Sequence, residues 1–338
     1  MEIKIYGDST SIMGLKILVA GGAGFIGSNI VDAYIQQGHS VIVVDNLITG
    51  RKENLNPKAK FYNTDITNKK RIMQIFETEK PDIVNHHAAQ IDVRKSVADP
   101  IFDATTNILG TINLLENSVR YGVKKFIFAS SGGVMYGECG TRRGESPTEN
   151  KTPEPLSPYG IAKRSVEYYL NYYAKISGLK YTALRYGNVY GPRQDPRGEA
   201  GVVTIFINRI LANEQVNPAL PQKTLRKGCV NIFGDGEQMR DYVFVSDIVN
   251  ANLIALIKGE NEIFNIGTGK TESVNQLFYE LSKITGYSQK PVYEYQRTGE
   301  LFKSSLDVRK AKKILGWSAK IKFSDGLKKT VDYFRKCE

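Results

Sequence analysis

Short apolar runs alternate with amphipathic segments through the first half of the chain. The runs are typical of strands buried on both faces, and the segments between them repeat apolar residues at helical spacing. After the first run, Ile26, Ile30 and Tyr34 recur every four residues, and Val31 and Ile35 widen the same face. The pattern predicts six strands in this half, at residues 15–20, 41–45, 60–63, 82–86, 125–130 and 180–186.

Strands that alternate with helices predict a Rossmann-type, doubly wound parallel α/β sheet. Two longer helices are expected at residues 101–121 and 159–177, and a cluster of Pro and Gly at 187–201 ends the alternation. We therefore expect a cofactor-binding domain at 14–186 and a smaller C-terminal α/β substrate-binding domain at 187–338. Residues 1–13 are expected to form an extension without the apolar core of a signal peptide.

In the second half, segments with helical spacing of apolar residues are mixed with short extended runs. Helices are expected at 202–212 and 247–258, and strands at 230–233 and 242–245. A short apolar run at 264–266 is expected to return to the first sheet, so that residues near 241–266 pack on the first domain. Residues 213–228 contain two prolines and little periodicity, which indicates an exposed loop. This basic loop is expected to be inert, although it could flank a bound nucleotide.

Charge and cysteine content narrow the function classes. The 46 basic and 35 acidic residues give a net charge of +11, but the basic residues are spread along the chain without a basic-aromatic repeat. A solvated basic surface is therefore favoured over nucleic-acid binding. No apolar run approaches the roughly 20 residues of a membrane span, so no membrane association is expected. The chain has three cysteines, an odd number and too few for a disulfide framework. This low cysteine content favours a cytoplasmic location.

The sequence Gly-Gly-Ala-Gly-Phe-Ile-Gly at residues 21–27 follows the first expected strand directly. Glycines at such a turn let a pyrophosphate approach main-chain N–H groups and the positive end of the next helix. Asp45 ends the second strand, eighteen residues past Gly27, where a carboxylate can bind an adenosine ribose and repel a 2′-phosphate. The combination predicts NAD as the cofactor.

Tyr159 and Lys163 lie four residues apart and therefore on one face of an expected helix. A phenol with a pKa near 10 is a poor base at neutral pH, but a nearby ammonium favours the phenolate. Hydroxyls at Ser130 and Ser131 follow the fifth strand, at the crevice where such sheets bind ligands.

Together these motifs resemble the extended short-chain dehydrogenase/reductase superfamily and, within it, the UDP-glucose 4-epimerase group, from Lys16 to about Tyr333. The resemblance implies Tyr159 as catalytic base, Lys163 as its activating partner, and a catalytic serine. His86-His87-Ala88-Ala89 matches the family's His-x-Ala-Ala, with a second histidine as a small departure. The implied cofactor contacts are Gly21, Gly24, Phe25, Ile26, Gly27, Asp45, Asn46, Asp65, Ile66, Ala88, Ala89, Asn107, Tyr159, Lys163 and Tyr186.

The same resemblance implies a UDP-sugar as substrate, with two arginines and an amide on its diphosphate and ribose. Planar guanidinium groups suit this task because they bind phosphate oxygens in pairs. Glu300 stands where the family usually has Asp, and Ser304 stands at a gate where small residues tend to admit N-acetyl groups. The implied substrate contacts are Ser131, Tyr159, Asn188, Val203, Phe233, Arg240, Arg297, Glu300 and Ser304.

The serine loop departs from the family's three consecutive hydroxyl residues, because it reads Ser131-Gly132-Gly133. If the loop is aligned with the family pattern without a gap from Tyr136, Gly132 falls at the position of the catalytic hydroxyl. We instead expect Ser131 to be the catalytic serine, with Ser130 as the second candidate. Related 4,6-dehydratases carry an Asp-Glu pair here and decarboxylases a glutamate, so two glycines favour 4-epimerisation through a transient 4-keto sugar. An enzyme of either kind, an epimerase for a different sugar, and a non-catalytic NAD sensor stay open as alternatives.

The resemblance also implies a homodimer, formed through the two long helices. Four tyrosines on the second helix have spacings that suit either that interface or the core: Tyr168, Tyr169, Tyr172 and Tyr173.

Overall fold

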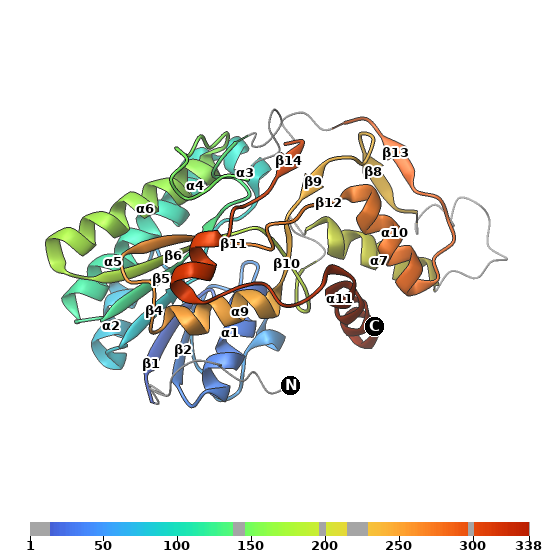
Figure 1. The fold of residues 1–338 in the computed structure, drawn as a ribbon. Coiled ribbons are helices and arrows are strands. Elements are labelled where there is room, and N and C mark those ends of the chain that lie inside the picture. The colour runs from blue at the N-terminus through green and yellow to red at the C-terminus, as the bar shows by residue number, and fades with distance from the viewer. Residues whose placement is uncertain (1–13, 138–145, 196–200, 215–228, 297–300, 338) are drawn as a thin grey trace.

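A seven-stranded parallel sheet forms the core of one part of the molecule, on the left of the computed structural model in Figure 1. The structure describes residues 14–137, 146–195, 201–214, 229–296 and 301–337. The strand order is β11-β6-β5-β4-β1-β2-β3, and every neighbouring pair is parallel. This confirms the expected Rossmann-type sheet. The strands are β1 (Lys16–Ala20), β2 (Ser40–Asp45), β3 (Lys60–Asn63), β4 (Ile83–His86), β5 (Lys125–Ser131), β6 (Lys180–Tyr186) and β11 (Glu262–Ile266).

The strand order reverses between β1 and β4, which places a crevice at the carboxyl ends of the central strands. Four residues that the sequence marks as chemically important follow or end these strands: Gly21 after β1, Asp45 in β2, Ser131 in β5 and Tyr186 in β6. Their common edge is the position at which open α/β sheets bind ligands.

Helices cover both faces of the sheet through two separate hydrophobic clusters. Residues of α1 (Phe25–Gln36) and α9 (Val245–Ala255) pack on one face together with the buried Trp317. Residues of α2 (Lys69–Glu79), α5 (Gly110–Arg120) and α6 (Pro158–Ser177) pack on the other face. The strand expected at 264–266 is confirmed as part of β11, which pairs with β6 at the edge of the sheet.

The helix expected at 101–121 is divided into three segments. These are α4 (Pro100–Ala104), the π-helix η2 (Thr105–Leu109) and α5. The Thr111 hydroxyl donates to the Asn107 carbonyl oxygen at 2.6 Å within this turn. Single π-turns inside helices are frequent at functional sites.

The remaining elements build smaller sheets and a third hydrophobic cluster, in which α7, α10 and α11 pack together (Figure 1). β7 pairs with β10, β8 with β13, and β9 with both β12 and β14. Residues 213–214 belong to α7, so the loop expected from residue 213 begins later, and 215–228 lie outside the described residues. The remaining bounds are η1 (Lys52–Asn54), α3 (Val93–Ala98), β7 (Asn188–Tyr190), α7 (Val202–Glu214), β8 (Asn231–Phe233), β9 (Met239–Arg240), β10 (Tyr242–Phe244), β12 (Glu272–Ser273), α10 (Val274–Thr285), β13 (Val292–Glu294), β14 (Lys303–Ser304), η4 (Ala311–Leu315) and α11 (Phe323–Cys337).

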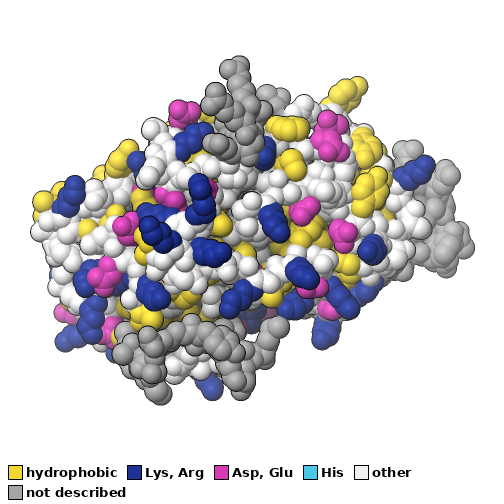
Figure 2. Space-filling model, in the orientation of Figure 1, with side chains coloured by type: hydrophobic (Ala, Val, Ile, Leu, Met, Phe, Trp, Pro, Cys, Tyr) yellow, Lys and Arg dark blue, Asp and Glu magenta, His cyan; other side chains and the backbone are white. Residues whose placement is uncertain are grey.

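Basic side chains are distributed over the face shown in Figure 2, with acidic side chains among them. This distribution fits the solvated basic surface that the sequence favours. Within the described ranges, no helix combines the length and hydrophobicity that crossing a bilayer requires.

Candidate active site

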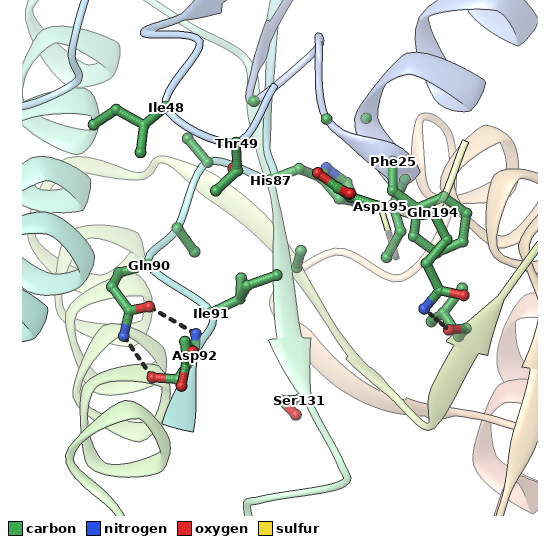
Figure 3. Close-up of a pocket in the computed structure, with 18 of the residues that line it drawn as sticks. Phe25, Ile48, Thr49, His87, Gln90, Ile91, Asp92, Ser131, Gln194 and Asp195 are labelled. Atoms are coloured by element: carbon green, nitrogen blue, oxygen red, sulfur yellow. Dashed lines mark hydrogen bonds between the residues drawn. The ribbon is translucent and has the colours of Figure 1, made fainter. Parts of the chain in front are cut away.

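A cavity of about 560 Å³ opens at the carboxyl ends of the central strands, within the size range of small-molecule sites. In Figure 3, Gln90, Ile91 and Asp92 lie on one side of it and Phe25 and Gln194 on the other. Most of the expected site residues line this one cavity: Gly21, Gly24, Phe25, Ile26, Gly27, Asp45, Asn46, Asp65, Ile66, Ala88, Ala89, Ser131, Tyr159, Lys163, Tyr186, Asn188 and Val203.

The glycine turn fits the pyrophosphate of NAD. Gly21 has φ +83°, and a side chain there would overlap the Ala88 backbone, while a Cβ on Gly27 would overlap the Gly21 carbonyl oxygen. The N-cap residue of α1, Gly24, makes no side-chain cap, so the first N–H groups of a twelve-residue helix are left for a ligand. An anion is the ligand that such a helix end prefers.

Asp45 links the glycine turn to the loop after β2. Its carboxylate accepts from Ala23 N at 3.0 Å and from Leu47 N at 2.9 Å, and it is buried beside the cavity. Burial raises the pKa of Asp45, while these two backbone bonds oppose the rise. A carboxylate held in this way suits a ribose hydroxyl and disfavours a 2′-phosphate.

Asn46 and Asp65 form a second polar pair on the same wall. Asn46 Nδ2 donates to Asp65 Oδ2 at 2.6 Å, and the Thr67 amide and hydroxyl both donate to Asp65 Oδ1. These bonds orient the two side chains and fix the start of the segment that carries Ile66, which is itself buried against the cavity. The adenosine end of the cofactor fits this wall.

Tyr159 and Lys163 occupy the first turns of α6, on the face that meets the cavity. Ser157 caps the helix by accepting from the Gly160 amide, and Pro158 occupies the first turn. Lys163 Nζ lies 5.7 Å from the centre of the Tyr159 ring and donates to the Ala129 carbonyl at 2.8 Å. Burial lowers the pKa of Lys163 to about 8.

The two serines of β5 have different surroundings. Ser130 is buried, and its hydroxyl donates to Glu167 Oε1 at 2.8 Å. Ser131 is partly exposed at the end of the strand, where Figure 3 shows it on the cavity. Both serines line the cavity, and the Ser130 hydroxyl is the one already bonded to a carboxylate.

The two glycines after Ser131 also differ in what surrounds them. A Cβ on Gly132 would lie 2.6 Å from Leu306 Cδ2, so a side chain there would require Leu306 to move. A Cβ on Gly133 would lie 3.8 Å from Asn188 Oδ1 and 4.0 Å from each of the Ser131 and Ser304 hydroxyls. Three oxygens from distant parts of the chain thus converge around a position that carries no side chain.

Four other expected contacts do not line this cavity, and one of them is Ser304 in β14. Asn107 is buried, and its amide is occupied by both backbone groups of Gln90 and by Asp103, so it supports the cavity wall instead of lining it. Phe233 lies in β8 and Arg240 in β9, and neither lines the cavity. Arg240 Nη1 donates to the Met239 carbonyl at 2.9 Å. Arg297 and Glu300 lie outside the described residues.

The cavity also contains residues that sequence reasoning missed. Arg51 and Asp195 form a 2.9 Å ion pair across 144 positions of sequence. His87 stacks on Tyr186, with ring centroids 5.9 Å apart, and its Nε2 lies 3.1 Å from the Tyr186 hydroxyl oxygen. Burial and the Lys163 charge lower the pKa of His87 to about 3, so this ring is neutral. Of these residues only His87 stood out in the sequence, as the second histidine of the His-x-Ala-Ala motif.

The arrangement can remove a proton from a substrate hydroxyl beside a bound dinucleotide. Tyr159 supplies the phenol, Lys163 the adjacent cation and Ser131 a second hydroxyl, all on one cavity. Among the described residues, no group of three or more His, Cys, Asp or Glu side chains is arranged to hold a metal ion.

The chain is similar in sequence and structure to several characterised proteins. A UDP-glucose 4-epimerase of Thermotoga maritima, solved with UDP-glucose, is 54% identical, with a TM-score of 0.89 over 96% of this chain and 99% of that one. A UDP-glucose 4-epimerase of Thermus thermophilus in complex with NAD is 40% identical, with a TM-score of 0.86 over 96% of this chain and all of that one. A UDP-N-acetylglucosamine 4-epimerase of Methanobrevibacter ruminantium is 33% identical, with a TM-score of 0.86 over 97% of this chain and all of that one.

The model of the NAD-dependent epimerase/dehydratase family matches residues 17–267, which include the glycine turn, the serine loop, Tyr159 and Lys163. In the structure the glycine turn, the serine loop, Tyr159 and Lys163 all contribute residues to the wall of the same cavity. The chain belongs to the NAD-dependent epimerase/dehydratase family.

Proposed function

We propose that the protein interconverts UDP-glucose and UDP-galactose by NAD-dependent epimerisation at the sugar C4. The observation that carries this proposal is one cavity that combines the NAD turn with Tyr159, Lys163 and Ser131, beside a loop whose next two residues are glycine. The similarity to the Thermotoga and Thermus UDP-glucose 4-epimerases supports the same reaction.

NAD held at the glycine turn and Asp45 would supply the hydride acceptor, and then the hydride donor, for the sugar C4. In the proposed reaction the Tyr159 phenolate accepts the proton of the C4 hydroxyl, and the Lys163 ammonium stabilises that phenolate. The Ser131 hydroxyl donates to the same sugar oxygen. The resulting 4-keto sugar rotates while its diphosphate stays bound. Asn188 lines the cavity, and the family resemblance implies that Arg297 and Arg240, which lies outside the cavity lining, contact the same diphosphate. Once the ketone presents its opposite face, Tyr159 returns the proton to the C4 oxygen.

The serine loop argues against the dehydratase and decarboxylase alternatives. Both need a carboxylate that serves a second proton transfer, and positions 132 and 133 carry glycine. Leu306 fills the space that a side chain at position 132 would need. A single base suffices for epimerisation, because the same proton leaves and returns.

UDP-N-acetylhexosamines are a second proposed substrate pair. Ser304 is small, and its hydroxyl lies near Gly133, in the group of oxygens that includes Ser131 and Asn188. A small residue at this gate leaves room for a substituent on the sugar C2. The similar UDP-N-acetylglucosamine 4-epimerase of Methanobrevibacter ruminantium supports this possibility.

The proposed assembly is a homodimer formed through α6 and its neighbours. Apolar side chains are exposed on α6 and on α4 and η2, which pack against it. Ile101 is 78% exposed, Ile176 71% and Tyr172 52%. Burying such a face against a second copy would remove apolar surface from water.

Two further expectations stay as proposals. Residues 14–186 are proposed to hold the cofactor and residues 187–338 the nucleotide sugar, with β11 and α9 packed on the first unit. The proposed location is the cytoplasm, where cysteines stay reduced. The Cys229 thiol donates to Gln289 Oε1 at 3.3 Å.

The test is product analysis after incubation with UDP-glucose, UDP-galactose and their N-acetylated counterparts, each alone. Conversion of each active substrate into its C4 epimer is expected, without net formation of NADH. The matched variant Tyr159→Phe lacks the base, and its turnover is expected to fall about 10³-fold while UDP binding persists. Net NADH accumulation would instead indicate a dehydrogenase, and undiminished turnover by Tyr159→Phe would contradict the assigned base.

A further inference from the structure

A buried ion pair, whose two residues do not line the cavity, joins β6 to α6. Arg185 Nε donates to Glu167 Oε1 at 2.8 Å, and Arg185 Nη2 donates to Glu167 Oε2 at 2.7 Å. Both side chains are almost fully buried, at 1% and 0% exposure. Arg164 adds a third donor to the same carboxylate, at 2.9 Å. A buried ion pair adds little net stability in general. We therefore consider which neighbouring groups this pair holds in place.

Both ends of the serine loop are bonded to this ion pair. Before the loop, the Ser130 hydroxyl donates to Glu167 Oε1 at 2.8 Å. After the loop, the Tyr136 hydroxyl accepts from Arg185 Nη1 at 2.5 Å. Ser131 follows Ser130 directly and therefore lies between two points that are held by one pair of charges.

The second anchor is itself fixed to the far edge of the sheet and to the C-terminal segment. The Tyr136 hydroxyl donates to Asn265 Oδ1 at 2.8 Å, and Asn265 Nδ2 donates to the Asp307 carbonyl at 3.1 Å. Asp307 follows Leu306, whose side chain packs with Tyr136 and lies against Gly132. The backbone of the loop is thereby enclosed between the ion pair and Leu306.

The same ion pair is connected to the base. Tyr159, Lys163 and Glu167 follow one another at four-residue spacing on α6, so they share one face of the helix. Lys163 Nζ donates to the carbonyl of Ala129, and Glu167 accepts from the next residue, Ser130. Two successive residues of β5 are thus bonded to two successive turns of the helix that carries the base.

We propose that Glu167 and Arg185 are positioning residues, which set the Ser131 hydroxyl at a fixed place relative to the Tyr159 phenol. This inference rests on the proposed function, because it concerns the approach of two hydroxyls to one sugar oxygen. A misplacement of about 1 Å at a reacting group can cost about a hundredfold in rate, so such an anchor has a catalytic consequence. Neither residue touches the substrate in this account.

The sharpest variant is Ser130→Ala, which removes one anchor and leaves the Glu167–Arg185 pair and Ser131 in place. We expect kcat to fall about tenfold or more, with KM for the UDP-sugar changed less than about threefold. The primary deuterium isotope effect on kcat, measured with UDP-[4-²H]galactose, is expected to rise because C4 chemistry becomes slower. A loss of folded enzyme would lower kcat without changing that isotope effect.

Amide hydrogen exchange gives a readout independent of turnover. The Gly132 amide donates to the Tyr186 carbonyl at 2.8 Å, and its exchange is expected to accelerate in Ser130→Ala. Tyr136→Phe removes the other anchor and should produce the same two effects. Ser118→Ala is the matched control, since this buried serine donates to the Leu114 carbonyl at 2.7 Å within α5 and bonds neither anchor of the loop. The control should leave kcat, the isotope effect and Gly132 exchange unchanged.

Two results would overturn the inference. One is a wild-type isotope effect and wild-type Gly132 exchange in both Ser130→Ala and Tyr136→Phe. The other is an equal change in Ser118→Ala, which would indicate a general loss of stability. If the wild-type protein failed to epimerise any UDP-sugar, the proposed function would fall, and the exchange comparison alone would then support or contradict the anchoring of the loop.

Discussion

Lys163 Nζ lies 5.7 Å from the centre of the Tyr159 ring while it donates to the main-chain carbonyl of Ala129 at 2.8 Å. The lysine is therefore held by β5 and presented to the tyrosine. Burial lowers the pKa of Lys163 to about 8, and the charges of Asp103 and Glu167 oppose that change. The cation that favours the Tyr159 phenolate thus titrates close to neutral pH.

This pKa predicts an alkaline limit to activity. Below pH 8 Lys163 is protonated and stabilises the phenolate, and as the pH rises through about 8 the cation and its effect are lost. We expect kcat to decline above about pH 8 and expect Lys163→Met to lower kcat by about a hundredfold at pH 7. A pH–rate profile from 6 to 10 measures both. An alkaline limb that persists unchanged in Lys163→Met would refute the assignment.

Gly27→Ala should disrupt cofactor binding. A Cβ there would overlap the Gly21 carbonyl oxygen, so the turn must shift, at a cost of about 2 kcal/mol in unfolding free energy. We expect loss of bound NAD, measured by absorbance after protein precipitation, and a lower Tm. Gly286→Ala is the control: it has φ +77° with open space around its Cβ position, so it should cost about 1 kcal/mol and retain NAD. Full NAD occupancy in Gly27→Ala would be inconsistent with the proposed pyrophosphate site.

Ser304→Tyr should change substrate preference. A tyrosine would occupy space near the Ser131 and Asn188 oxygens, where the C2 substituent is proposed to lie. We expect kcat/KM for UDP-N-acetylglucosamine to fall at least about tenfold more than kcat/KM for UDP-glucose. Parallel kinetics with the two substrates measure the ratio, and an equal loss for both would show that Ser304 is not a gate.

Ile101→Glu should weaken the proposed dimer. Ile101 is 78% exposed on α4, which packs beside α6, and a charge in a buried apolar interface is unfavourable. Light scattering after gel filtration is expected to show a dimer for the wild-type protein and a monomer for the variant. Ile314→Glu, at a 44% exposed position of η4, should leave the dimer intact. A monomeric wild-type protein would contradict the interface.

The sheet and the cofactor turn were predictable because their signals are local. The apolar run before Gly21 and the acid at the end of β2 each lie within one element, and the structure places both at the cavity. The choice between Ser130 and Ser131 was different, because it depends on Glu167 in another element. The absence of a side chain at position 132 is likewise explained by contact with Leu306, which is 174 positions away in the sequence.

Other features depend on side chains that meet only in the folded chain. The π-turn that divides the helix expected at 101–121 involves Asn107, whose amide is bonded to Gln90 on another loop. The Arg51–Asp195 pair joins the two halves of the chain across the cavity. No spacing or composition rule marks these residues, since each is an ordinary polar residue until its partner is known.

The most direct test follows the hydrogen atom on the sugar C4. We expect UDP-[4-²H]galactose to be converted into UDP-[4-²H]glucose with the deuterium retained at C4, because the hydride leaves and returns within one turnover. Mass spectrometry and proton NMR of the product measure the label directly, and Tyr159→Phe should give almost no labelled product. Exchange of the C4 deuterium with solvent, or its accumulation in released NADH, would contradict the account.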